Sequence, residues 1–562
     1  MKILLKNGFV INVFTGEIEK ENVLIGEEKI LGVGAYEDSE ADVVYDVSGK
    51  YICPGFMDGH IHIESTMMTP YEFARTVIPH GTTAVVADPH EIANVSGMSG
   101  IAYMLEESEN IPMTVYMVVP SCVPATSLDE AGASLEARDI RPLYKHPRVL
   151  GLGEMMNYPG VLANDKKVLQ KIEDAHKCGK LVNGHAPLLS GKALDQYIAA
   201  GIQDDHECSS ADEAKERIRK GQWVMIREGT AARNLSDLLT LFDEPWSRRC
   251  LLVTDDRHPA DLLEKGHIDG IIRKAVEAGK SAITGIRMAT IQAAQCFGLR
   301  NVGAVSPGYM ADILVLSDLD KVEVCDVIYH GRKVVDNGRL VEFEKPFIRH
   351  DIWKTVRNSF CLNELRKENF HIEPKGRFCR VIKTIPDQLL TEEMITEIDF
   401  EHRNGVDIER DILKISVVER HLSTGHIGLG FISGIGMKKG AIASSVSHDS
   451  HNLIVIGANE EDMTIAANRI RTLGGGLIVV ADGEILAEMP LPVAGLMSQL
   501  SAAEAARENE DIRRAVYSLG VPENIEPFMT MAFVSLPVIP KLKMTTRGLA
   551  NVESQEIVPL FV

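Results

Sequence analysis

The sequence lacks the features of a secreted or membrane protein. Its nine cysteines are scattered, odd in number and never spaced as CxxC, so we expect free thiols and a reducing, cytoplasmic compartment. No apolar run approaches the roughly 20 residues that a membrane helix requires. The first residues carry no signal-peptide pattern. These absences exclude a disulfide framework and a membrane-spanning segment from the expected architecture.

Basic residues are also in deficit, with 59 Lys and Arg against 80 Asp and Glu and a formal net charge of −21. A surface of that sign repels nucleic acids and anionic membranes, so neither is an expected partner. At 45% hydrophobic and 25% charged residues, the chain has ample apolar material for large cores. Its 562 residues predict three to four domains, at about 150 residues each.

Two β-rich stretches flank a long central segment. The first 54 residues contain short strand patterns separated by Gly and Asn-Gly turns, and similar patterns return over residues 305–345. We expect 1–54 and 305–345 to fold together as one small β-sandwich domain. The segment between them would then be an inserted domain of its own.

The central segment, 55–304, contains eight short apolar runs, each ending in polar residues and followed by a helix-compatible stretch. Runs that are continuous rather than alternating are typical of buried parallel strands with helical crossovers. The predicted fold class is therefore α/β, with a (β/α)8 TIM-like barrel whose chemistry lies at the carboxyl ends of the strands. Residues 346–562, with new strand patterns and an Ala/Glu-rich helix, predict a C-terminal α/β domain.

Metal-ligating residue types stand at the ends of these apolar runs. His60 and His62 are two residues apart on a predicted strand, so both imidazoles point to one side and can share an ion. The alternative is that these histidines are ordinary core residues with hydrogen-bond partners. That alternative does not explain why four histidines follow strands at the same end of one predicted barrel. Nitrogen and oxygen ligands without Cys suit a divalent pair such as manganese, iron or zinc. Later runs end with Glu154, His185, His206 and Asp255.

These motifs resemble those of the amidohydrolase superfamily, a group of metal-dependent hydrolases. The resemblance rests on GFMDGHIHIESTMMTP, GLGEMMN, NGHAP and TDDRHP, and the strings ADPHEIANVSG and SHDSHNLIVIGANEEDM narrow it to the bacterial-type adenine deaminases. HxH and the TD strand end are shared by many amidohydrolases, whereas HIES, DPHEIANV and HDSHN are much more specific. The resemblance covers essentially the whole chain.

The resemblance implies a binuclear centre with a role for each ligand. The HxH histidines would hold one ion together with Asp255, His185 and His206 would hold the second, and Glu154 would bridge the two. Glu154 stands where hydantoinase-like relatives carry a carboxylated lysine, and GLGEMMN contains no Lys that could form such a bridge. Asp256 remains an alternative to Asp255, which is preferred because the first Asp after Thr is the usual ligand in similar enzymes.

The implied reaction is the hydrolytic deamination of adenine to hypoxanthine and ammonia in purine salvage. A metal-bound hydroxide, available at neutral pH, would attack the ring carbon that bears the amine. Asp255 would take the hydroxide proton and pass it towards the departing ammonia. Candidates for donating a proton to a ring nitrogen are Glu207, His90 and Glu91, although Glu207 could instead orient His206.

Further polar residues are candidates for substrate binding. Asp88 follows the second strand of the predicted barrel, where capping of the loop is the alternative role, and Asp256 follows the last strand. In the C-terminal domain, His448, Asp449 and His451 could close over the substrate or help to bind metal. A loop of this composition is often only a hydrogen-bonded turn.

Two other functions remain open at this stage. A guanine deaminase-like or dihydropyrimidinase-like hydrolase of cyclic amides or amidines would share the ligand set. A non-catalytic scaffold would offer the acidic surface to protein partners, but scaffolds tend to lose ligands, and here every ligand position is filled. The expected partners are a small-molecule substrate and further copies of the chain, in a homodimer or higher homo-oligomer.

Overall fold

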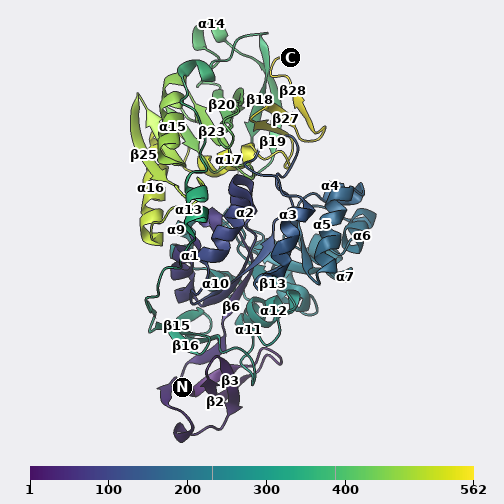
Figure 1. Ribbon diagram of the computed structural model, residues 1–562, viewed down its shortest axis with the longest axis vertical. Coiled ribbons are helices and arrows are strands. Elements are labelled where there is room, and N and C mark those ends of the chain that lie inside the picture. Colours follow the sequence, from purple (N-terminus) through teal and green to yellow (C-terminus); the bar gives the residue numbers. More distant parts are fainter. Residues whose placement is uncertain (231, 386–387) are drawn as a thin grey trace.

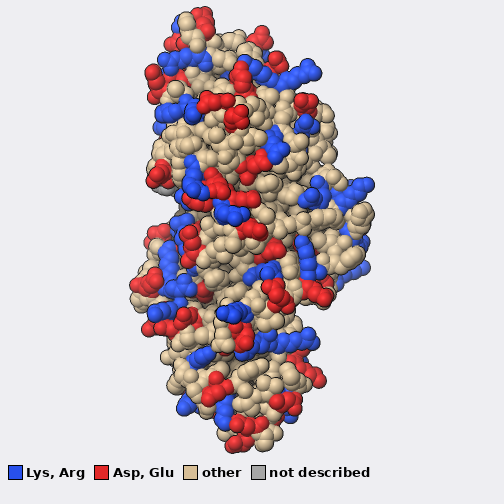
Figure 2. Space-filling model, turned by 90° about the vertical axis from the view of Figure 1, so that its left-hand side faces the viewer, with Lys and Arg blue, Asp and Glu red and all other residues tan. Residues whose placement is uncertain are grey.

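A computed structural model describes residues 1–230, 232–385 and 388–562, in three regions arranged along its long axis (Figure 1). The N-terminal strands lie at one end, a barrel lies in the middle and the C-terminal region lies at the other end. No helix among the described residues is both long enough and apolar enough to cross a membrane. Basic and acidic side chains are interspersed over the face shown in Figure 2.

The middle region is a barrel of parallel strands, which confirms the predicted α/β fold. β13 closes on β6, because the Asp255 N–H donates to the His60 carbonyl at 2.9 Å and a parallel bridge joins Asp255 to Ile61. Every residue of β7 is buried, which explains why the apolar runs are continuous. The strands are β6 (Phe56–Ile61), β7 (Thr82–Ala87), β8 (Thr114–Val119), β9 (Val149–Met155), β10 (Leu181–Gly184), β11 (Asp204–Asp205), β12 (Trp223–Arg227) and β13 (Cys250–Val253).

Helices connect these strands and cover the barrel. α5 shows how the sequence determines such a helix. The Asp165 side chain caps its start by accepting from the backbone N–H groups of Lys167 and Val168, and apolar residues such as Ile172 and Ala175 are buried on one face. The helices are α1 (Pro70–Val77), α2 (His90–Glu107), α3 (Ala137–Ile140), α4 (Tyr158–Leu162), α5 (Lys166–Lys177), α6 (Gly191–Ala199), α7 (Ala211–Arg219), α8 (Leu235–Leu238), α9 (Pro259–Lys265), α10 (Ile268–Glu277), α11 (Ala282–Arg287) and α12 (Ala293–Cys296).

The two β-rich flanks of the barrel pair with each other. β5 runs antiparallel to β14, with Tyr51 opposite Leu316 and Pro54 opposite Ile313. The strands are hydrogen-bonded in one continuous sheet, and the expected β-sandwich with the limits 1–54 and 305–345 stays a prediction. The strands are β1 (Lys2–Ile11), β2 (Ile18–Gly26), β3 (Lys29–Gly34), β4 (Val43–Asp46), β5 (Tyr51–Pro54), β14 (Ile313–Asp318), β15 (Glu323–Tyr329), β16 (Arg332–Asp336) and β17 (Arg339–Leu340).

The C-terminal region is a mixed sheet with helices packed on it. Its strand order is β19-β18-β21-β20-β23-β22-β24-β25, and β26–β28 form a small separate sheet. The strands are β18 (Phe378–Thr384), β19 (Thr391–Glu397), β20 (Leu413–Val418), β21 (Ile427–Ser433), β22 (Ala441–Ser444), β23 (Leu453–Gly457), β24 (Gly476–Ala481), β25 (Glu484–Pro490), β26 (Leu542–Thr545), β27 (Gly548–Asn551) and β28 (Glu556–Val558). The helices are α13 (His350–Arg357), α14 (Phe400–Arg403), α15 (Glu460–Leu473), α16 (Ala502–Ser518) and α17 (Pro527–Val534).

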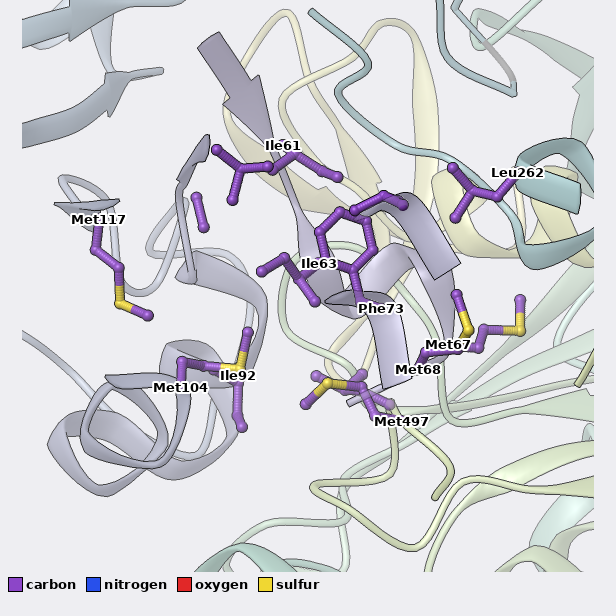
Figure 3. Packing of buried hydrophobic residues seen from close by; sticks show 14 of the residues in the cluster. Ile61, Ile63, Met67, Met68, Phe73, Ile92, Met104, Met117, Leu262 and Met497 are labelled. Carbon is purple, nitrogen blue, oxygen red and sulfur yellow. The ribbon is translucent and has the colours of Figure 1, made fainter. Parts of the chain in front are cut away.

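Apolar contacts fix the C-terminal region over the carboxyl end of β6. Met67 and Met68 follow this strand, and Figure 3 shows them beside Met497 of the C-terminal region and Phe73 of α1. The Ser498 N–H donates to the Met67 carbonyl at 2.8 Å. The methionines thus belong to a shared core that joins the barrel to the C-terminal region.

We expect Phe73→Ala to lower the free energy of unfolding by about 3–5 kcal/mol, because the ring is fully buried and its removal leaves a cavity in the core. Urea unfolding followed by circular dichroism would measure the change. Phe347→Ala is the matched control, since this ring is 83% exposed and its loss should cost less than about 0.5 kcal/mol. Equal unfolding midpoints for the two variants would contradict the packing described here.

Candidate active site

The HxH pair stands at the end of β6, where the His62 ring and the His60 backbone are each held by an aspartate. The His62 Nδ1–H donates to the Asp88 carbonyl at 2.9 Å, which leaves Nε2 facing the barrel mouth. The His60 Nε2 is buried and has no hydrogen-bond partner among the described residues. The Asp58 carboxylate accepts from the His60 backbone N–H at 3.1 Å. An orienting bond at one ring nitrogen and a free second nitrogen are typical of metal-binding histidines.

Glu154, the last residue but one of β9, lies between two groups of imidazoles. Its Oε1 is 3.3 Å from the His62 Nε2, and its Oε2 is 2.5 Å from the His185 Nδ1 and 3.2 Å from the His206 Nε2. The Glu154 backbone N–H donates to the Asp88 carboxylate at 2.9 Å. The carboxylate therefore faces the HxH pair with one oxygen and the other two imidazoles with its second oxygen.

Asp255 follows β13 in the left-handed backbone region, with a φ of 60°. Aspartate is one of the few residues other than glycine that adopt this conformation readily, and it directs the side chain here towards the HxH pair. Its Oδ1 lies 3.1 Å from the His62 Nε2 and 3.7 Å from the His60 Nε2. The Asp256 carboxylate instead accepts from the Ser65 hydroxyl at 2.5 Å. This geometry favours Asp255 over Asp256 as the ligand.

All six predicted ligands fall in overlapping groups whose donor atoms lie within 4.8 Å of one another. Imidazole nitrogens and carboxylate oxygens are the donors that first-row divalent ions accept, so these residues fit a metal centre. His90 and Glu207, expected from the sequence to be proton donors, belong to the same groups. The groups are His60–His62–Asp255, His60–Glu154–His206, His185–His206–Glu207 and His62–His90–Glu154.

The charges of the site keep its carboxylates ionised. Burial acts to raise the pKa of Glu154, but the imidazoles of His185, His206 and His62 outweigh it and hold this pKa well below its usual range. Burial likewise acts to raise the pKa of Asp255, and the Arg227 guanidinium and the His62 imidazole lower it well below its usual range. Two ionised carboxylates among imidazoles form a site suited to cations.

Arg227, the last residue of β12, is a site residue that the sequence analysis missed. Its Nη1–H donates to the Asp255 Oδ2 at 2.7 Å and also bonds the Glu207 carboxylate. Burial acts to raise the pKa of Glu207, but Arg227 and His185 lower it below its usual range. The only signal in the sequence was an arginine at the end of an otherwise apolar run, WVMIREGT.

Two buried aspartates next to the predicted ligands were also missed by the sequence analysis. The Asp58 carboxylate is buried at the barrel seam, where it accepts from the Thr254 backbone N–H at 3.2 Å and lies 3.1 Å from the His267 Nε2. The Asp205 carboxylate accepts from the backbone N–H groups of Ala186 and Glu207. These buried carboxylates fix the chain beside the ligands, and nothing in their spacing pointed to this role.

The predicted C-terminal residues reach the barrel through Glu91 and His90. The Glu91 Oε1 lies 2.5 Å from the His448 Nδ1, and its Oε2 bonds the His451 Nε2. The His90 Nδ1 is 3.3 Å from the Glu154 Oε1, and its Nε2 is 3.9 Å from the Asp449 Oδ1. The structure thus brings together the predicted residues of both regions.

We expect Glu154→Gln to lower the amount of divalent metal bound per chain, because the substitution removes the charge that both imidazole groups share. Metal analysis of protein purified without chelators would measure it. Glu107→Gln changes a buried glutamate of α2 in the same way outside the groups described above, and it should retain the metal of the unaltered protein. Equal metal content in both variants would contradict a bridging position for Glu154.

Comparisons with known proteins agree with this geometry. Residues 51–334 match the amidohydrolase family, and residues 388–556 match the adenine deaminase C-terminal domain. The chain is 48% identical over 559 residues to adenine deaminase 2 of Carboxydothermus hydrogenoformans, covering 99% of this chain and 96% of that protein. It is 45% identical over 560 residues to adenine deaminase of Desulfatibacillum aliphaticivorans, covering 100% and 97% of the two chains. The chain therefore belongs to the adenine deaminase family of the amidohydrolases.

Proposed function

We propose that the protein is an adenine deaminase, which converts adenine and water to hypoxanthine and ammonia and serves purine salvage. The observation that carries the proposal is the position of Glu154, between the HxH pair on one side and His185 and His206 on the other. A carboxylate in this place supports a two-ion hydrolase, and the membership of the chain in the adenine deaminase family supports adenine as the substrate.

The proposed cofactor is a pair of divalent ions, with manganese or iron favoured and zinc as the alternative. The HxH histidines and Asp255 would hold one ion, His185 and His206 the other, and Glu154 both. When bound, such ions make a water molecule reactive at neutral pH and polarise the group under attack. The all-nitrogen-and-oxygen donor set fits each of these metals, and availability decides between them.

Asp255 is proposed to move the proton of the reaction. One of its oxygens faces the HxH histidines, and the other is held by Arg227 at 2.7 Å. The carboxylate can therefore take a proton from the attacking water without turning away, and it can pass this proton towards the departing ammonia. Arg227 fixes the direction of the carboxylate and compensates its charge.

The remaining predicted residues divide into two proposed roles. Glu207 is paired with Arg227, which keeps its carboxylate ionised and favours a supporting role beside His206 over protonation of the substrate. His90, between Glu154 and Asp449, is the better-placed proton donor. Asp88 supports His62 and Glu154 through its carbonyl and carboxylate. Asp256, His448, Asp449 and His451 are proposed to face the substrate or to position groups that do.

A cytoplasmic location and a homo-oligomeric state are also proposed. All nine cysteines are free in the structure, and most of them are buried, which fits a reducing compartment. Size-exclusion chromatography coupled to light scattering would give the number of copies in the assembly.

We expect the metal-reconstituted protein to release ammonia from adenine and to form hypoxanthine, with much lower activity on guanine and hydantoin. Chromatography of the products on this panel would measure it. Hydrolysis of hydantoin without ammonia release from adenine would replace the proposal by a dihydropyrimidinase-like function. Preferential conversion of guanine would replace it by guanine deamination.

We expect Asp255→Asn to lower kcat for adenine by at least about 100-fold, because an amide cannot accept the proton of the attacking water. Steady-state kinetics at matched metal content would separate this effect from loss of the ions. Asp243→Asn is the matched control, since this carboxylate is exposed and pairs only with Lys280 among the described residues. A variant at position 255 with unaltered kcat would contradict the proposed proton transfer.

A further inference from the structure

His448 is held across the boundary between the barrel and the C-terminal region. It lies on the loop after β22, its ring stacks on Phe533 of α17 at a centroid distance of 4.6 Å, and its Nδ1 is 2.5 Å from the Glu91 Oε1. Glu91 belongs to the first turn of α2 and is fully buried. The stacked ring and the carboxylate together leave the imidazole one orientation.

The second imidazole of the loop fixes the Glu91 carboxylate in turn. The Ser447 backbone N–H donates to the His451 Nδ1 at 3.2 Å, so the proton of the neutral ring lies on Nε2, which bonds the Glu91 Oε2. Both oxygens of Glu91 therefore accept from imidazoles of the C-terminal region. This arrangement is a hydrogen-bonded clamp, and the tautomer of His451 argues against a metal ion between these three residues.

The Nε2 edge of His448 is unused. Among the described residues this nitrogen has no hydrogen-bond partner, while Nδ1 at the other edge of the ring is taken by Glu91. Burial acts to lower the pKa of His448, but Glu91 and, more weakly, Asp256 raise it to about 9. The Glu91 oxygen that bonds His448 also lies 3.4 Å from the Nε2 of His90, a residue of the metal groups, so a single carboxylate separates the imidazole from these groups.

A cleft lies beside the phenylalanine ring on which His448 stacks. A cavity of about 760 Å³ opens between the barrel and the C-terminal region, and its lining includes His258, which follows β13, and Phe533, on which His448 stacks. Because Glu91 contacts both His90 and His448, a planar base bound at the metal groups would lie close to a stacked imidazole whose Nε2 is unpaired among the described residues.

We propose that His448 donates its Nε2 hydrogen to a ring nitrogen of the purine bound at the metal groups, with Glu91 as the positioning residue that holds the imidazole. This inference rests on the proposed adenine deamination. The purine ring nitrogens that carry no hydrogen are acceptors, and a fixed donor facing one of them favours a purine over a ring with carbon at that place. The C-terminal region would thereby supply part of the substrate recognition.

Two substitutions of His448 separate its two nitrogens. In His448→Asn the amide nitrogen replaces Nδ1 and keeps the bond to Glu91, but no donor remains at the Nε2 position. In His448→Gln the longer side chain places its amide nitrogen near Nε2. We expect kcat/KM for adenine to fall by about 10- to 150-fold in His448→Asn, the loss typical of one charge-assisted hydrogen bond, and to recover in part in His448→Gln. His402→Asn, at an exposed histidine of α14, is the control.

Deaza analogues of adenine identify the contacted nitrogen. Inhibition constants of 1-, 3- and 7-deazaadenine would be measured for the unaltered protein, His448→Asn and Glu91→Gln, at matched metal content. We expect the unaltered protein to discriminate against the analogue that lacks the contacted nitrogen. We expect both variants to lose this discrimination. If Glu91 had a purely structural role, Glu91→Gln would discriminate between the analogues as the unaltered protein does.

The outcomes distinguish this inference from the function on which it rests. If the unaltered protein releases no ammonia from adenine, the proposed function fails. If it does, and His448→Asn retains both its kcat/KM and the discrimination against every analogue, the role of His448 alone is overturned. If His448→Asn loses the discrimination and Glu91→Gln keeps it, His448 remains the proposed donor, but the proposed positioning role of Glu91 is overturned.

Discussion

The structure depends on one electrostatic arrangement: the carboxylates of Glu154 and Asp255 buried among the imidazoles of several strands. Charges removed from water are costly unless opposite charges compensate them within a few ångströms. Here the carboxylates at the ends of β9 and β13 are compensated by side chains at the ends of β6, β10, β11 and β12, and only a closed barrel brings these ends together. The fold and the charge balance of the site are therefore mutually dependent.

Behind this arrangement lies a layer of buried polar groups that set its geometry. Asp88 is the clearest case, because its carbonyl orients the His62 ring and its carboxylate receives the Glu154 N–H. Arg227 acts in a similar way from the opposite side, by holding Asp255 and Glu207 together. Supporting groups of this kind fix both the direction of each ligand and its protonation state.

The sequence was sufficient for features that depend on local pattern. Continuous apolar runs predicted the parallel strands, and the two-residue spacing of His60 and His62 predicted one shared face. Arg227 was not predicted because a single buried arginine forms no pattern. The order in which the N-terminal strands pair was not predicted either, because strand pairing is not encoded in spacing. The contact between Glu91 and His448 joins residues 357 positions apart and exists only after two regions dock. The ligand roles and domain limits remain predictions.

The seam between β6 and β13 has a consequence for assembly. The His60 carbonyl accepts from the Asp255 N–H, so the same residues close the barrel and supply its ligands. A growing chain emerges with its HxH pair long before the strand that completes their surroundings. Ions at this site would therefore have no finished place to enter until the last strand had docked on the first, and their uptake would belong to the final stage of folding.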